Sequence, residues 1–121
     1  AAVYVKAHPE IIQQLETALP ELRQLLTTRA AELRDRVPAD YADDVDALKT
    51  RTQTILDRID VRRALGEDVT TELWLLDIAK AEAAQYEAIA DTTRAAQLRT
   101  VSATIADIAI KVLIAAVLAT A

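Results

Sequence analysis

The 121-residue sequence lacks cysteine, methionine and phenylalanine, and it has one glycine, three prolines and one histidine. Without cysteine there is no disulfide, thiolate nucleophile or cysteine-ligated metal site. One glycine cannot build a phosphate-binding loop, and one histidine cannot supply the paired Glu-x-x-His motifs of di-iron bundles. We expect His8 to be a capping or exposed side chain. The sequence therefore predicts a protein that is not an enzyme and has no cofactor or metal.

The residues that are abundant favour helix. Hydrophobic residues make up 52% of the chain, and many are alanine and leucine, which have the highest helix propensity. With 14 basic and 19 acidic side chains the net charge is −5, and no run of basic residues could neutralise a phosphate backbone. We expect one all-α domain over residues 1–121 that does not bind nucleic acid.

Apolar residues three and four positions apart predict a first helix over residues 9–37, after an extended arm at residues 1–8. Pro9 suits the first turn of this helix. Pro20 lies within the pattern and is expected to kink the helix or split off its first turns, because proline has no amide hydrogen.

A second helix is predicted over residues 40–64. Asp40 follows a proline and is a candidate N-cap, while aspartates cluster near the start of the helix and arginines near its end, as the helix dipole favours. Gly66 is predicted to be the left-handed residue that ends the helix. Asp68 is a candidate cap for the next one.

Residues 68–121 contain neither glycine nor proline. One helix over this length would extend about 80 Å, roughly twice the length of the others. Either it breaks or it projects from the bundle. Threonine and serine gather within residues 91–104, where they lower helix propensity, so we place a break there and predict helices over residues 68–95 and 102–121.

The segment 102–121 is apolar on almost every side, and its only charged residues are Asp107 and Lys111. Such a helix must be covered by its own bundle, by a partner chain or by a lipid bilayer. Its length just reaches the roughly 20 residues that a transmembrane helix needs. An ion pair inside the bilayer is costly, however, which favours packing among other helices.

Leu73, Trp74, Leu75 and Leu76 form a second dense apolar run, and four consecutive residues point to all sides of a helix. We expect Leu73 and Leu76 in the core, and we consider Trp74 as an exposed anchor for another chain or for a membrane interface. The residues predicted to contact a partner or membrane are Trp74, Leu75, Ile105, Ile108, Val112, Leu113, Val117 and Leu118.

Together these patterns predict an antiparallel bundle of three long helices with a strongly apolar C-terminal helix. This is either a four-helix bundle or a three-helix bundle with an extended last helix. The predicted function is that of a non-catalytic assembly or interaction protein whose C-terminal helix contacts a protein partner or other copies of the chain. The alternative is a membrane-associated protein, of the tail-anchored or pore-forming type, that is anchored by or inserts residues 102–121. No small-molecule substrate is predicted.

Overall fold

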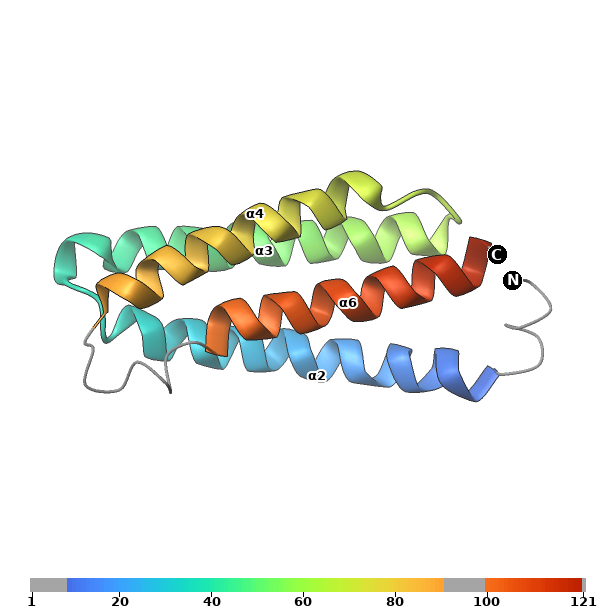
Figure 1. The fold of residues 1–121 in the computed structure, drawn as a ribbon, viewed down its shortest axis with the longest axis horizontal. Coiled ribbons are helices and arrows are strands. Elements are labelled where there is room, and N and C mark those ends of the chain that lie inside the picture. The colour runs from blue at the N-terminus through green and yellow to red at the C-terminus, as the bar shows by residue number, and fades with distance from the viewer. Residues whose placement is uncertain (1–8, 91–99, 121) are drawn as a thin grey trace.

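The chain folds into an all-α four-helix bundle (Figure 1). The computed structural model describes the backbone of residues 9–90 and 100–120 and the side chains of residues 13–90 and 101–116, and these contain no strand. The helices are α2 (Pro9–Arg34), α3 (Ala39–Ala64), α4 (Thr70–Ile89) and α6 (Thr100–Thr120). The predicted fold class is confirmed, and of the two predicted arrangements the four-helix bundle is the observed one.

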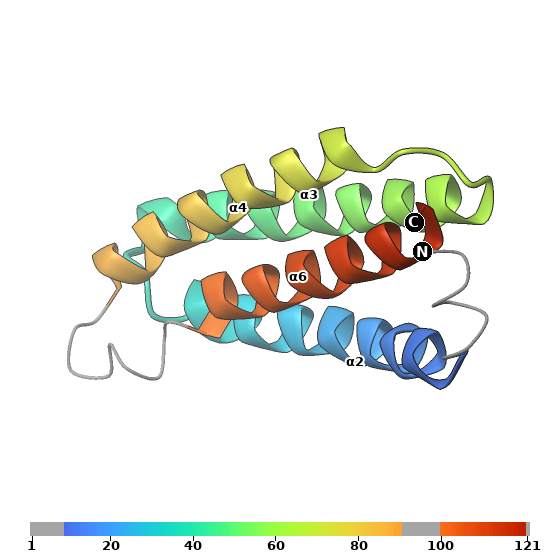
Figure 2. The same ribbon diagram turned by 45° about the vertical axis from the view of Figure 1, so that its right-hand side comes forward.

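The four helices form a closed ring in which each one packs against two neighbours. Consecutive helices run antiparallel, and α6 lies between α4 and α2 (Figures 1 and 2). The start of α2 and the end of α6 are therefore at the same end of the bundle. This arrangement lets four amphipathic helices share one core.

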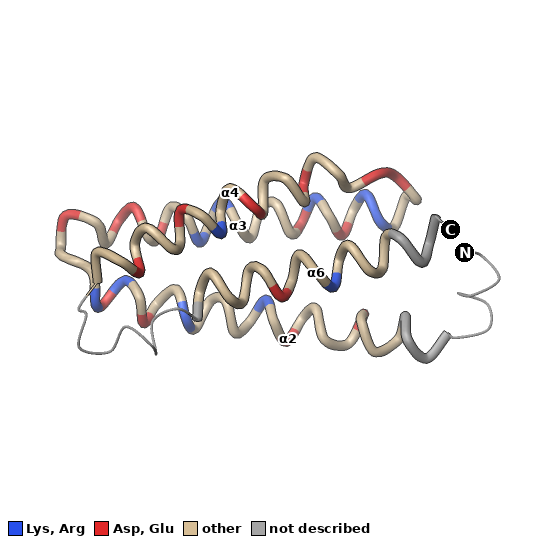
Figure 3. The backbone as a smooth tube through the Cα atoms, in the orientation of Figure 1, with Lys and Arg blue, Asp and Glu red and all other residues tan. Residues whose placement is uncertain are grey.

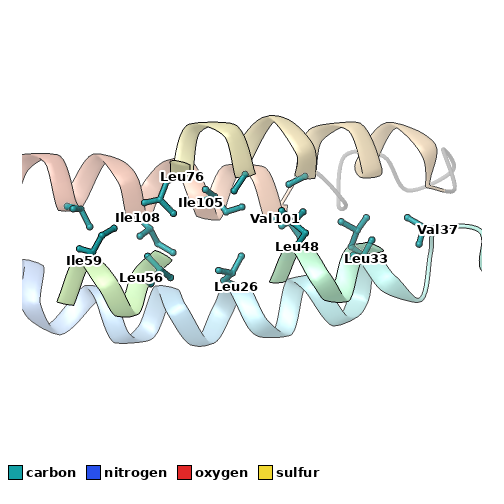
Figure 4. Packing of buried hydrophobic residues seen from close by; sticks show 14 of the residues in the cluster. Leu26, Leu33, Val37, Leu48, Leu56, Ile59, Leu76, Val101, Ile105 and Ile108 are labelled. Atoms are coloured by element: carbon teal, nitrogen blue, oxygen red, sulfur yellow. The ribbon is translucent and has the colours of Figure 1, made fainter. Parts of the chain in front are cut away.

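The core runs along the bundle axis and takes residues from all four helices (Figure 4). Buried residues recur three and four positions apart, which places them on one face of each helix. The largest fully buried side chains are Leu26, Leu33, Ile59, Leu76, Ile105, Ile108, Val45, Val112 and Thr52. Burying one large aliphatic side chain contributes about 1.5–3 kcal/mol, so this core dominates the stability of the fold.

The first helix differs from its prediction in two ways. It ends at Arg34 and not at residue 37, because the following proline disfavours helix at Val37. Val37 is nevertheless buried, and its N–H donates to the carbonyl of Leu33 at 3.1 Å. Pro20 lies inside an uninterrupted helix, so the predicted splitting of the helix at this residue is wrong.

The prediction for the start of α3 is also wrong. The helix begins at Ala39, one residue before the predicted cap, and Pro38 precedes it without a side-chain capping bond. Asp40 lies in the first turn instead. Its negative charge still favours this position, because the helix N-terminus carries a partial positive charge.

The end of α3 is as predicted. Gly66 has φ +71°, a conformation that glycine adopts without the steric cost that other residues meet. The N–H of Gly66 donates to Arg63 O at 3.1 Å, and the N–H of Glu67 donates to Arg62 O at 2.8 Å. This pair of bonds is the Schellman motif, which satisfies the last carbonyls of a helix.

The predicted start and cap of α4 are wrong: the helix begins at Thr70 and not at residue 68, and its N-cap is Val69 and not Asp68. Asp68 nevertheless contacts the first residue of the helix. One carboxylate oxygen of Asp68 accepts hydrogen bonds from the N–H of Thr70 at 3.1 Å and from its hydroxyl at 2.6 Å. These two bonds favour the ionised carboxylate and lower the pKa of Asp68 below its usual value. The residue immediately before the helix, Val69, is buried in the core.

The predicted break in the last third of the chain is confirmed. The helix α4 ends at Ile89, Ala90 is extended, and α6 begins at Thr100. The second half of the predicted break region, from residue 100 onward, is helical. The predicted helical residues 91–95 and 121 and the predicted arm at residues 1–8 lie outside the described residues.

Candidate functional site

The eight residues predicted to contact a partner lie in different environments. Trp74 and Leu113 are exposed, with 64% and 51% of their surface accessible, and Leu75 is half-buried. Ile105, Ile108 and Val112 are buried in the core, where the chain's own helices cover them. The side chains of Val117 and Leu118 lie outside the described residues.

Trp74 points away from the core of the bundle. The buried residues of α4 include Leu76, Ala79 and Ala83, and at 100° per residue Trp74 lies on the opposite side of the helix from them. The outward side of α4 then continues through exposed, uncharged residues, namely Ile78, Ala81, Gln85 and Ala88. The exposed charged residue near this side is Asp77, which pairs with Lys80 on the same helix. So few charges are unusual on the outer surface of a helix whose other side is already buried.

The outer side of α6 is also apolar. Ile110 is 55% exposed, and Ile114 is exposed one turn further along the helix. The charged residues of α6 are Asp107 and Lys111 (Figure 3), and they pair with each other at 3.1 Å. The sequence analysis did not select Ile110 or Ile114. Their position opposite the buried stripe of α6 is the signal that could have identified them.

A groove of about 310 Å³ lies between α4 and α6. Small side chains on α6, Ala106 and Ala109, leave this hollow, and Leu73 and Leu113 form parts of its two walls. The remaining lining residues are Leu76, Asp77, Lys80, Ile105 and Ile110. We call the groove together with the exposed Trp74 beside it the α4–α6 face.

The surface between α2 and α3 has a different character. Arg23 on α2 donates to Oε1 of Gln53 at 2.9 Å and pairs with Asp57 at 2.5 Å and Asp60 at 3.1 Å on α3. Further pairs between the two helices join Arg34 to Asp46 and Arg63 to Glu16. Charged groups on this side of the bundle are therefore largely used to join two helices of the same chain.

The sequence analysis missed a buried carboxylate at the start of α4. Glu72 is only 3% exposed, and its Oε1 lies 2.6 Å from Nε of Arg62 at the end of α3. Its other oxygen is buried without a hydrogen-bond partner. Arg62 also pairs with Glu67 at 3.0 Å. The cluster connects the end of α3, the following turn and the start of α4.

A second missed carboxylate lies at the other end of α4. Glu87 is 7% exposed and accepts hydrogen bonds from the N–H of Ser102 at 2.7 Å and from its hydroxyl at 3.0 Å. Ser102 is in the first turn of α6, where backbone N–H groups have no partner within the helix. Glu87 of α4 thus supplies a hydrogen-bond acceptor to an N–H in the first turn of α6, and its negative charge interacts favourably with the helix dipole.

The contact between α3 and α4 perturbs two titratable groups. A hydrogen bond to Glu82 raises the pKa of the Arg51 guanidinium, whose Nη2 lies 2.7 Å from that carboxylate. Burial raises the pKa of Tyr86, whose ring lies 6.3 Å from that of Tyr41. Tyr41 itself is exposed. These shifts arise from helix packing and ion pairing.

Two further properties concern the part of the chain that the structure describes. Within it, no three potential metal-ligating side chains come together as a metal site. Over residues 9–90 and 100–120, no helix has the combination of length and hydropathy that crossing a membrane requires.

Comparisons with known proteins add no assignment. No family model matches the chain, and no curated protein or solved structure matches it significantly.

Proposed function

We propose that this chain is a non-catalytic interaction protein that binds a protein partner through the α4–α6 face. The observation that carries the proposal is the exposure of Trp74 beside an apolar groove whose far wall carries Ile110 and Leu113, also exposed. Tryptophan is enriched among the residues that dominate binding energy, especially next to well-packed apolar pockets. Contiguous exposed apolar surface on a soluble domain is a mark of an interaction site.

The charges on this face support binding by apolar contact. The two charged residues that line the groove, Asp77 and Lys80, pair with each other at 3.2 Å on α4. Each charge is thus offset within its own helix. The centre of a protein interface is depleted of charged residues, and this face meets that description better than the ion-paired surface of α2 and α3.

The buried carboxylates do not enter the proposed function. Glu72 and Glu87 bond to Arg62 and Ser102 of neighbouring segments, and these contacts join helices. We assign both side chains to the stability of the fold, and we propose no catalytic role for the chain.

Binding of a hydrophobic fluorescent dye tests the proposal. We expect the wild-type chain at low protein concentration to enhance the dye's fluorescence. The double variant Trp74→Ser, Leu113→Ser should lose most of that enhancement. The matched control is Val61→Ser, because Val61 is equally exposed but lies on α3 outside the face. Equal enhancement by the wild type and the double variant would overturn the proposal.

The membrane alternative is separated by flotation with liposomes made from neutral and anionic phospholipids. Under the proposed function the wild-type chain stays in the soluble fraction with the double variant. If the wild type floats and the double variant does not, the partner of this face is a lipid surface and the proposal of a protein partner is wrong.

A further inference from the structure

We infer that the partner of the α4–α6 face is a second copy of this chain, bound about a two-fold axis so that Trp74 of each copy enters the groove of the other. The inference rests on the proposed function, since it names the partner of the same surface. Two observations carry it: the shape of the face and its charge balance.

The face has a projecting side chain and a hollow next to each other. Trp74 protrudes on the side of α4 away from the core, and the neighbouring residue, Leu73, lines the groove. A cavity of roughly 150 Å³ in a protein core accepts a benzene ring, so a groove of about 310 Å³ has room for an indole ring. Leucine and isoleucine side chains in its lining offer apolar contacts to that ring.

The proximity of projection and hollow suits two-fold symmetry. In such a dimer the same patch contacts itself, so every contact between one residue and another occurs twice. A patch that carries both Trp74 and the groove meets this condition with one surface. A different partner would need only one of the two features.

The charge of the face also favours a second copy. Its one acidic side chain, Asp77, is matched by Lys80, which also lines the groove, so their formal charges cancel, whereas the whole chain carries −5. Two copies that met through an acidic surface would repel each other. The neutral face brings no such repulsion, and it gives a strongly basic partner nothing to pair with.

Sedimentation velocity on the full chain over a wide concentration range tests the inference. We expect a monomer–dimer equilibrium, and we expect the emission of Trp74, the only tryptophan in the sequence, to shift to shorter wavelength over the same range as the indole leaves water. The substitution Trp74→Ala should weaken dimerisation at least about 30-fold, the range of an interface hot spot. Val61→Ala, outside the face, should leave the dissociation constant unchanged.

A mixing experiment separates loss of the contact from damage to the fold. Ala106→Arg places a long charged side chain over the groove and should also prevent dimerisation, while Trp74 remains. When Trp74→Ala and Ala106→Arg chains are mixed, one intact tryptophan meets one intact groove, so the mixture should dimerise more strongly than either variant alone. Circular dichroism should show the wild-type helix content in both variants.

Three outcomes would overturn the inference. If the wild type dimerises and Trp74→Ala dimerises equally well, the interface lies elsewhere. If the mixture associates no better than its components, the reciprocal contact is wrong. If the wild type stays monomeric at all concentrations, the partner is not a second copy; dye binding that depends on Trp74 would then preserve the proposed function, and the absence of such binding would overturn both.

Discussion

The two halves of the bundle present opposite surfaces around one shared core. The α2–α3 half joins its helices through ion pairs centred on Arg23 and Arg34, whereas the outer side of α4 and α6 exposes Trp74, Ile110 and Leu113. Both halves bury a similar apolar stripe inside. The difference between the halves therefore lies in their outer sides: ion pairs between its own helices occupy one, and apolar side chains are exposed on the other. The comparison teaches that a shared core places no constraint on the character of the outer surface.

The ion pairs of the α2–α3 half are not what makes the bundle stable. Exposed pairs typically contribute between 0 and about 1 kcal/mol each, while each large core side chain contributes more. Such pairs do select which helix faces match and keep that side hydrated. The exposed residues of the α4–α6 face have no comparable partner within the described chain, so removing them should cost binding and little stability.

The prediction with the largest expected effect tests which side of α6 faces the core. Ile108→Ala, at a side chain that is fully buried, should lower the free energy of unfolding by about 3 kcal/mol, because it leaves a cavity. The identical change at Ile110, two residues along and mostly exposed, should cost about 0.5 kcal/mol or less. Urea unfolding followed by circular dichroism, at low protein concentration, measures both. Equal losses would contradict the orientation of α6.

The prediction with the next largest effect tests whether polar contacts, in addition to apolar ones, hold α6 in place. Glu87→Ala should lower the free energy of unfolding by about 2 kcal/mol, because it removes the carboxylate that accepts from both the part-buried N–H and the hydroxyl of Ser102. Glu87→Gln should cost about half as much, since the amide keeps one acceptor oxygen.

Glu82→Ala serves as the control on the same helix, because its pair with Arg51 is more exposed. This change should cost no more than about 1 kcal/mol. If Glu82→Ala were as costly as Glu87→Ala, the special role of Glu87 at the start of α6 would be wrong. The same urea titrations supply both values.

A prediction with a smaller expected effect tests the ion pairs of the α2–α3 half directly. Arg23→Met keeps an apolar stem of similar length and removes the contacts to Gln53, Asp57 and Asp60. We expect a loss of about 1 kcal/mol at low ionic strength, because these groups are partly exposed. The loss should shrink in 1 M NaCl, where the Debye length is about 3 Å. A loss independent of salt would show that Arg23 acts through packing alone.

The smallest effect concerns the turn that connects the two halves. Asp68→Asn should lower the melting temperature slightly at neutral pH, because the ionised carboxylate accepts two hydrogen bonds from Thr70. The pKa of Asp68 is lowered in the folded state. The contribution of Asp68 to stability is therefore present at pH values above its pKa in the unfolded chain. It is lost as the pH falls through its pKa in the folded state. Thermal melts of both proteins should converge in acid; a constant gap would contradict this account.

Much of the fold could be predicted from the sequence, because it depends on local patterns. Apolar spacing located all four helices, Gly66 marked the end of α3, and the gathering of threonine and serine placed a break before α6. The errors lie at the ends: the end of α2 and the starts of α3, α4 and α6 differ by one to three residues, and Ala90, predicted to be helical, is extended. Helix ends depend on small competing contacts, so spacing alone locates them poorly.

The surface was less predictable than the fold. The apolar character of α6 and of the run around Trp74 was visible, but which residues turn outward depends on where three other helices pack. Glu72 and Glu87 share the spacing of the buried residues Leu76, Ala79 and Ala83, yet charged residues are rarely buried unless they are paired. Their partners come from other segments, which no local pattern reveals.

The even number of antiparallel helices returns the end of α6 to the start of α2. A circularly permuted chain, joined there by a short flexible linker and opened in the turn after Arg34, would retain every helix and every neighbour. The new ends would lie at the far end of the bundle, remote from the side chain of Trp74. A protein fused to the new ends would therefore lie away from the end of the bundle at which α2 begins, and the ring of helices would be unchanged.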